Sequence, residues 1–193
     1  MAKTWNLVVR LHEYYRSQKT PYRIRFISEP VCWTEVPEDK ASLAQQRNRW
    51  HRGLADSLFR YRHMLFNPRY GRIGLFAMPF FVFVELLSPV IEFSGYILVP
   101  LSWWMGITNG HFALLFMTVA VLFGMILSVS AVFLEELTSR RYERPLDTFI
   151  LAGYALLENV GYRQLHAWWR LKGLVDFIKG NKEWGTMLRK GIG

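Results

Sequence analysis

No lysine or arginine occurs between Arg72 and Arg140 in this chain of 193 residues. The 67 residues of this gap include four glutamates and therefore have a formal net charge of −4, whereas the flanking segments 1–72 and 140–193 carry +8 and +5. In a typical water-soluble domain about a quarter of the residues are charged, so a gap of this length is rare there. We therefore exclude an ordinary soluble globular domain, and we interpret the gap as a membrane segment.

The longest apolar run lies at residues 112–134, where the polar side chains are Thr118, Ser128 and Ser130. An α-helix rises about 1.5 Å per residue, so these 23 residues would extend about 35 Å. The hydrocarbon core of a bilayer is about 30 Å thick. We expect a single helix that spans the membrane.

The apolar stretch at residues 73–105 is too long for one straight crossing, and it contains Pro79, Pro89 and Pro100. Proline breaks or kinks a helix, so we expect a kinked span that follows an in-plane amphipathic turn and crosses mainly at residues 86–105. Cationic loops stay on the cytoplasmic side, and both flanks are basic. Two crossings therefore predict a multi-pass protein of the cell (inner or plasma) membrane with both termini in the cytoplasm.

A third apolar stretch, residues 146–160, has only 15 residues and includes Glu158. This length favours a re-entrant or interfacial helix over a span, and Glu158 is expected to form a local pair with Arg163. Beyond it, aromatic and apolar side chains recur at helical spacing opposite Arg163, Arg170 and Lys172. That pattern predicts a basic aromatic helix on the membrane surface.

The first 72 residues have a different pattern. Apolar residues on one face predict a helix that ends near Thr20-Pro21, and the alternation at residues 22–27 predicts a short strand. Pro37-Glu38-Asp39 then opens a second helix, with acidic residues at its start where they suit the helix dipole.

The predicted fold is thus mainly α and integral to the membrane, with interfacial amphipathic helices, about two transmembrane helices and one short N-terminal strand. Residues 1–72 form a cytoplasmic segment, residues 73–139 the membrane domain, and residues 140–193 cytoplasmic re-entrant or interfacial helices with a basic tail.

The second N-terminal helix carries Gln46, Arg47, Arg49 and Trp50. Positions i, i+3 and i+4 share one helical face, so the amide of Gln46, the guanidinium of Arg49 and the indole of Trp50 should lie together. An indole stacks on a sugar ring, while arginine and glutamine hydrogen-bond hydroxyls or pyrophosphate oxygens. These residues are candidates for donor and acceptor binding. In the alternative interpretation, Trp50 anchors an interfacial helix and the arginines contact lipid phosphates.

Two segments together carry a family resemblance: Glu-Pro-Val-Cys-Trp-Thr-Glu-Val-Pro at residues 29–37, and Gln-Arg-Asn-Arg-Trp at residues 46–50 followed by Arg-Gly at 52–53. They resemble the Gln-x-x-Arg-Trp region of the processive, membrane-embedded family 2 glycosyltransferases, such as cellulose, hyaluronan and poly-N-acetylglucosamine synthases. The resemblance implies that residues 46–50 help to bind the nucleotide sugar and the acceptor end of a glycan. It also implies that the predicted strand is a remnant of a GT-A-type domain.

Such enzymes need an Asp-x-Asp metal site, with Mg²⁺ or Mn²⁺, and a Thr-Glu-Asp type base. This sequence contains no Asp-x-Asp, and the positions that correspond to the base read Ala2-Lys3-Thr4. The resemblance therefore implies the C-terminal part of an enzyme whose catalytic aspartates lie upstream, with no catalytic residue and no metal or other cofactor bound by this chain, which alone would be inactive.

Glu85 and Glu92 are seven residues apart and would lie on nearly the same helical face if Pro89 does not rotate them. A carboxylate inside a membrane has a high free-energy cost, and such residues usually have a functional role. They could line a glycan path or accept hydrogen bonds from neighbouring helices, or they could lie at an interface where they reach water.

The five histidines show no metal-ligand spacing, and Cys32 is the single cysteine, so no metal site or disulfide is implied.

We expect membrane lipids as partners because the cations flank apolar spans. Nucleic-acid binding is not expected because no recognition motif accompanies these cations. Two functions remain. The chain is either the membrane and acceptor-binding part of a glycosyltransferase, whose catalytic domain lies upstream or is separate, or a non-catalytic membrane scaffold for a separate glycosyltransferase subunit.

Overall fold

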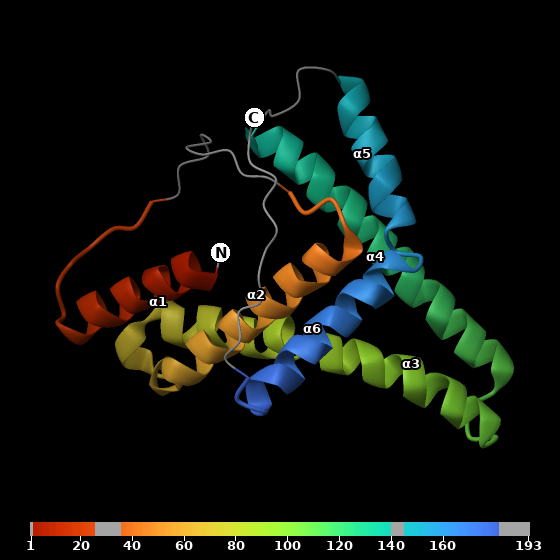
Figure 1. The fold of residues 1–193 in the computed structure, drawn as a ribbon, viewed down its shortest axis with the longest axis horizontal. Coiled ribbons are helices and arrows are strands. Elements are labelled where there is room, and N and C mark those ends of the chain that lie inside the picture. The colour runs from red at the N-terminus through yellow and green to blue at the C-terminus, as the bar shows by residue number, and fades with distance from the viewer. Residues whose placement is uncertain (1, 26–35, 140–144, 182–193) are drawn as a thin grey trace. The chain divides into compact units, whose positions relative to one another are not determined.

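The computed structural model describes residues 2–25, 36–139 and 145–181, and it is mainly helical over these ranges (Figure 1). Its elements are α1 (Ala2–Ser17), α2 (Lys40–Arg60), η1 (Arg62–Met64), η2 (Pro68–Tyr70), η3 (Ile73–Ala77), η4 (Phe80–Leu86), α3 (Ser88–Trp104), α4 (Gly110–Ser139), α5 (Pro145–Leu157) and α6 (Tyr162–Ile178). The chain divides into two compact units, Met1–Ile91 with Ala167–Gly193, and Glu92–His166.

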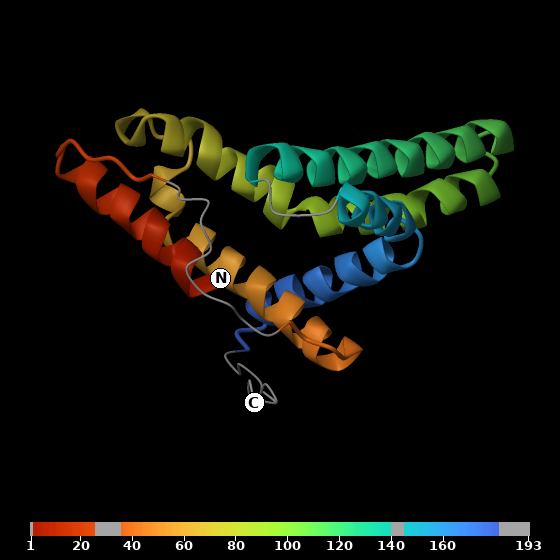
Figure 2. The same ribbon diagram turned by 90° about the horizontal axis from the view of Figure 1, so that it is seen from above.

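The first unit is built on α1 and α2, which lie side by side (Figure 2). Both helices form where the sequence predicts them, and α2 begins at an N-cap, Asp39, whose side chain accepts a hydrogen bond from the Ser42 amide at 2.8 Å. This cap satisfies a backbone donor that the first turn leaves without an intrahelical partner. The Ser42 hydrogen bonds also lower the pKa of the Asp39 carboxyl.

A small apolar core holds the first unit together. Its buried members come from α1, α2 and the segment that follows α2; they are Val9, Leu58, Tyr61, Met64, Tyr70 and Met78. The chain from α2 to η3 turns tightly, and a Cβ on Gly74 would lie 2.5 Å from the Asn67 carbonyl oxygen and 2.6 Å from that of Met64. Only glycine permits this approach, which brings η3 back onto the core.

Residues 73–104 form the first long apolar helix, and prolines shape it. The π-helical segments η3 and η4 flank Pro79. The helix is interrupted at Leu87, two residues before Pro89, and α3 begins at Ser88. Proline lacks the N–H that a regular helix needs and its ring disfavours the preceding helical turn. The helix is therefore irregular in the stretch where a kink is predicted, and it is interrupted at Leu87.

The second unit contains the rest of α3, then α4 and α5. Helices α3 and α4 meet at a turn in residues 105–109, from which they diverge in Figure 1. At this turn Thr108 Oγ1 donates to Ser102 Oγ at 2.9 Å, and Asn109 Oδ1 accepts from the His111 amide at 3.0 Å. The helix expected at residues 112–134 is confirmed as α4, 30 residues long.

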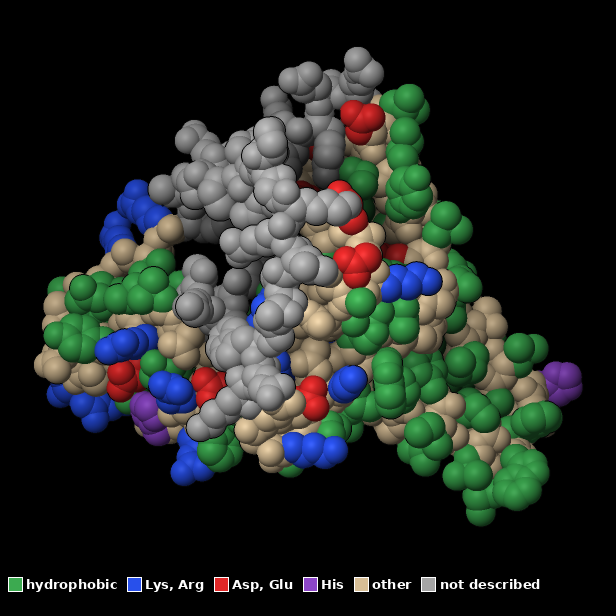
Figure 3. Space-filling model, viewed as in Figure 1, with side chains coloured by type: hydrophobic (Ala, Val, Ile, Leu, Met, Phe, Trp, Pro, Cys, Tyr) green, Lys and Arg blue, Asp and Glu red, His purple; other side chains and the backbone are tan. Residues whose placement is uncertain are grey.

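By length and composition alone, the helices Ile73–Trp104 and Gly110–Thr138 could each cross a membrane. Little of either helix is buried within the protein. Hydrophobic side chains cover the region of α3 and α4 in Figure 3, as expected for helices that face lipid.

Helix α5 packs along α4. It starts at Pro145, a residue favoured at the first helical position, and Phe133 of α4 meets Phe149 of α5 edge to face at 6.2 Å between ring centroids. With 13 residues it is about 20 Å long, which is shorter than the hydrocarbon core. The chain then turns at Gly161, whose φ is +84°, into α6.

The short strand expected at residues 22–27 is not observed over its described part. Residues 22–25 form neither helix nor strand, and residues 26 and 27 lie outside the described residues. A strand needs a neighbouring strand to pair its backbone groups. None of the described segments, 2–25, 36–139 and 145–181, supplies one.

Candidate functional site

The predicted binding residues Gln46, Arg49 and Trp50 lie on one face of α2, all partly buried. Arg47 stacks its guanidinium over the Trp50 indole, with its central carbon 4.9 Å from the ring centroid. This cation–π contact restricts the rotation of the indole. We call residues 46–50 the 46–50 segment.

The other side of α2 is buried against its own unit. His51, Ala55 and Leu58 are buried there. About three turns beyond Gln46, the buried Ser57 accepts a hydrogen bond from Asn6 of α1 at 3.0 Å, which ties α2 to α1. At 100° per residue, His51 and Asn48 point away from the face that carries Gln46 and Trp50. The 46–50 segment is thus presented on a helix whose reverse side is fixed.

Helix α6 contacts this reverse side at Asn48. A Cβ on Gly173 would lie 2.6 Å from the Asn48 carbonyl oxygen, so the missing side chain allows the two helices to cross. Asn48 Nδ2 donates to Asp176 Oδ2 at 2.7 Å, and Arg52 donates to the Asn181 carbonyl at 2.9 Å.

Arg170 of α6 extends this contact to the first apolar helix. Its Nε donates to His51 Nδ1 at 3.4 Å, and its NH2 donates both to the Glu85 carbonyl and to Glu85 Oε1, the latter at 3.0 Å. In a regular helix the Glu85 carbonyl would accept from the amide of residue 89, but Pro89 has no N–H. Arg170 therefore satisfies a carbonyl that the proline leaves without its helical partner, and Ser88 Oγ approaches the same oxygen at 3.3 Å.

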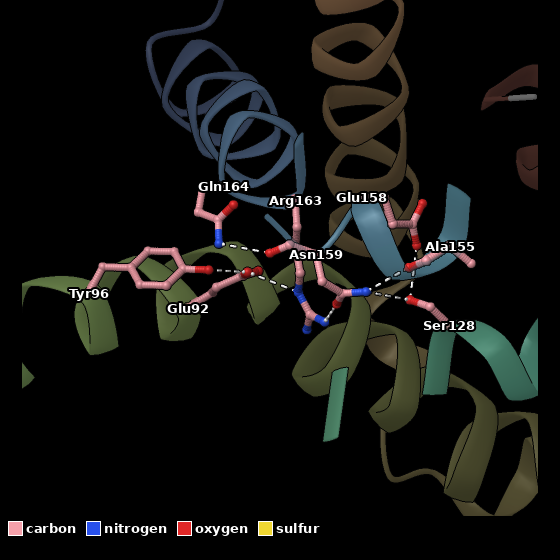
Figure 4. A network of polar contacts seen from close by, with 8 residues as sticks. All are labelled: Glu92, Tyr96, Ser128, Ala155, Glu158, Asn159, Arg163 and Gln164. Atoms are coloured by element: carbon pink, nitrogen blue, oxygen red, sulfur yellow. Dashed lines mark hydrogen bonds and ion pairs between the residues drawn. The ribbon is translucent and has the colours of Figure 1, made fainter. Parts of the chain in front are cut away.

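The second predicted carboxylate, Glu92, lies in the second unit and belongs to a different network (Figure 4). Its Oε1 accepts from Tyr96 at 2.7 Å and from Arg163 Nε at 3.2 Å. Glu85 and Glu92 are thus each bound by an arginine of α6, and the two arginines, like the two glutamates, are seven residues apart.

Asn159 is the buried centre of this second network, with 3% of its surface exposed. Its side chain donates to the Ala155 carbonyl at 2.8 Å and accepts from Arg163 at 3.1 Å. Ser128 of α4 donates to Glu158 at 2.9 Å (Figure 4). Gly124 of α4 makes room for the network, because a Cβ there would lie 2.4 Å from Arg163 NH1.

These contacts correct one expectation about α6, because the Arg163 side chain pairs with Glu92 rather than locally with the Glu158 side chain. The physical reason is that an unpaired carboxylate in an apolar helix has a large desolvation cost. A cationic partner lowers this cost, whereas further apolar surface does not. Arg163 and Arg170 both bind acceptors within the protein, whereas half of Trp168 is exposed. The place of this helix on the membrane surface stays a prediction.

Sequence reasoning did not single out Asn48, Asp176, Gly124 and Gly173. Long-range pairs leave no local pattern in the sequence. The available signals were the polar Asn48 between the motif residues and the glycines within α4 and α6.

Most of the predicted motif at residues 29–37, including Cys32, lies outside the described residues. Within residues 2–25, 36–139 and 145–181, no three His, Cys, Asp or Glu side chains form a cluster that could hold a metal ion.

On α1, the His12 ring lies against Tyr22, to which it is hydrogen-bonded. Burial, and secondly the charge of Arg16, lower the pKa of His12 below 6.5. The neutral imidazole is therefore the favoured form in the folded protein.

Comparison with known proteins identifies the family to which the chain is similar. Residues 14–134, more than half of the chain, match the family described as glycosyl transferase family group 2. A stretch of 70 residues is 34% identical to chitin synthase 8 of Mycosarcoma maydis, covering 36% of this chain and 3% of that protein. The chain thus matches only a small part of this much longer relative, and no solved structure matches it significantly. The family match covers α2, the 46–50 segment, the first long apolar helix and most of α4, and on this evidence the chain belongs to glycosyl transferase family group 2.

Proposed function

We propose that this chain is the membrane and acceptor-binding part of a glycosyltransferase that moves a sugar from a nucleotide sugar to a growing polysaccharide or a lipid-linked acceptor. The observation that carries the proposal is the shared face of Gln46, Arg49 and Trp50 on α2, within the region that matches the family. The same pattern supports a processive enzyme related to the cellulose, hyaluronan and poly-N-acetylglucosamine synthases.

In such a transfer, an acceptor hydroxyl displaces the nucleoside diphosphate from the anomeric carbon of the donor. The residues of this chain bind and orient. The Trp50 indole, held by Arg47, offers a flat apolar surface to a pyranose ring, and the forked guanidinium of Arg49 suits pyrophosphate oxygens. Gln46 can donate to or accept from sugar hydroxyls.

We assign proton transfer and metal binding to residues outside this chain. The complete enzyme would use Mg²⁺ or Mn²⁺, but the described residues offer no ligand set that fits such an ion. No step proposed for this chain passes through a metal.

The membrane arrangement is part of the proposal. Helices Ile73–Trp104 and Gly110–Thr138 would cross the cell membrane, residues 1–72 and 140–193 would lie on the cytoplasmic side, and the basic flanks would contact anionic lipids. The 13 residues of α5 suit a re-entrant or interfacial helix. Glu85 and Glu92 are engaged by arginines, which favours helix packing as their first role; a place along the path of a glycan stays a prediction.

The proposal is tested in the complete enzyme by Trp50→Ala. We expect polymer formation to fall much more than membrane insertion, because the indole is assigned to sugar binding. Trp104→Ala is the matched control, since that indole is 81% exposed at the end of α3. Equal losses of polymer and of inserted protein in the Trp50 variant would support the alternative anchor role.

The alternative function is a non-catalytic scaffold or partner subunit for a separate glycosyltransferase. It is favoured by the sequence itself, which contains no Asp-x-Asp. The DNA upstream distinguishes the two: a stretch that encodes Asp-x-Asp and Thr-Glu-Asp, in frame or shifted, supports the first function, and a promoter with a start site supports the second. Sugar transfer by this chain alone in detergent would contradict both.

A further inference from the structure

We propose that α6 supports the acceptor site from the reverse side of α2 and that Arg170 is the positioning residue that holds the 46–50 segment in place. This inference rests on the proposed function for the binding role of the 46–50 segment. The docking of α6 on α2 is independent of that function and can be measured separately. All the contacts involved lie within the first compact unit.

Helix α6 contacts α2 at Asn48 and His51. Asn48 lies within the 46–50 segment and His51 directly follows it, but both point to the reverse of the helix from Gln46 and Trp50. A helix that binds both Asn48 and His51 therefore fixes the rotation of α2 without covering the face assigned to the sugar.

Arg170 is suited to this task by the geometry of its guanidinium. It donates to His51 on α2 and to both the carbonyl and the carboxylate of Glu85, with 19% of its side chain exposed. A planar guanidinium has five N–H donors in a fixed fork, so one side chain can tie α2 to the first apolar helix next to its interruption at Leu87. A lysine, with a single nitrogen, cannot span both positions in the same way.

The contact with His51 also has a chemical signature. Arginine can only donate a hydrogen bond, so His51 Nδ1 must accept, and the ring proton lies on Nε2 in the neutral imidazole. Removal of the guanidinium removes this constraint on the tautomer. A residue that merely filled space would leave the tautomer unchanged.

A second point of contact prevents α6 from pivoting about Arg170. Gly173 lies against the Asn48 carbonyl, where a Cβ would come within 2.6 Å, and Asp176 accepts from the Asn48 side chain at 2.7 Å. The spacing of positions 170, 173 and 176 places all three on one side of α6. Two separate anchors fix both the distance and the angle between the helices.

The test uses the full chain in lipid nanodiscs. Arg170→Met should raise the hydrogen-exchange rates of amides in residues 46–52 by about tenfold and should shift the ¹⁵N resonances of His51 away from the pure Nε2–H pattern. Arg170→Lys should restore part of the exchange protection through Glu85 but not the tautomer. Arg60→Met is the control, because Arg60 pairs on the surface with Asp56 at 3.5 Å, with 63% of its side chain exposed; it should leave both readouts unchanged.

A second pair of variants distinguishes a loss of the α2–α6 contact from general unfolding of the protein. Gly173→Ala should raise exchange in the same residues, whereas Gly153→Ala, where a Cβ would meet nothing within 4 Å, should not. Unchanged exchange and an unchanged His51 tautomer in the Arg170 variants would overturn the proposal. In the complete enzyme, Arg170→Met should raise the acceptor KM more than it lowers kcat.

Failure of the two ideas can be told apart. If Trp50→Ala leaves sugar transfer intact, the proposed function fails whatever α6 does. If Trp50→Ala abolishes transfer while the Arg170 variants change neither exchange nor KM, the positioning role fails and the proposed function stands.

Discussion

Replacement of Arg163 by methionine removes the guanidinium from the network in Figure 4 and keeps most of the apolar stem. Asn159, which is 3% exposed, loses the donor to its Oδ1, and an unsatisfied buried acceptor costs about 1–3 kcal/mol. The Arg163–Glu92 ion pair, with side chains 46% and 23% exposed, adds about 0.5–1 kcal/mol. We therefore expect the free energy of unfolding to fall by about 1.5–4 kcal/mol.

Reversible unfolding of the purified chain in mixed micelles measures this loss, and a double-mutant cycle with Glu92→Gln isolates the ion pair. We expect a coupling energy of about 0.5–1 kcal/mol. The control is Arg60→Met, whose exposed pair with Asp56 should change stability by less than about 0.5 kcal/mol. If Arg163→Met costs no more than the control, the network does not stabilise the second unit and this reasoning is wrong.

Two further predictions concern pH and topology. The pKa of His12 is lowered in the fold, below the ordinary value of 6.5. The stability that neutral His12 contributes is therefore complete above pH 6.5 and is lost as the pH falls below it. The Tm should decline over this range and His12→Gln should flatten the decline, whereas identical curves of Tm against pH for both proteins would refute the assignment. Cysteine labels at Asn109 and Gly193, in a variant without the native cysteine, should react from opposite sides of the membrane, and labelling of both from one side would overturn two crossings.

The helices were largely predictable from sequence because their signals are local. The apolar run at residues 112–134 predicts α4, the acidic residues around Asp39 predict the start of α2, and Pro89 predicts the irregularity at Leu87. Each of these depends on side chains within a few residues of the feature. The strand failed where it is described because strand formation depends on a distant partner that the alternating pattern at residues 22–25 does not supply.

The candidate site was predictable only in part, for the same reason. Helical spacing places Gln46, Arg49 and Trp50 on one face, but it says nothing of what supports the reverse side. The ion pair of Glu85 joins residues that are 85 positions apart in the sequence, and that of Glu92 joins residues that are 71 positions apart. Sequence reasoning assigned both arginines to the membrane surface. Identical spacing of seven residues between the glutamates and between Arg163 and Arg170 was the available clue.

The most direct test of the account is the acceptor dependence of sugar transfer by the complete enzyme carrying Trp50→Ala, measured as initial rates at saturating nucleotide sugar. The account predicts that the acceptor KM rises about tenfold or more, a loss of about 1.4 kcal/mol of binding, while the amount of enzyme inserted in the membrane is unchanged. An unchanged acceptor KM with normal insertion would contradict the assignment of the 46–50 segment to the acceptor site.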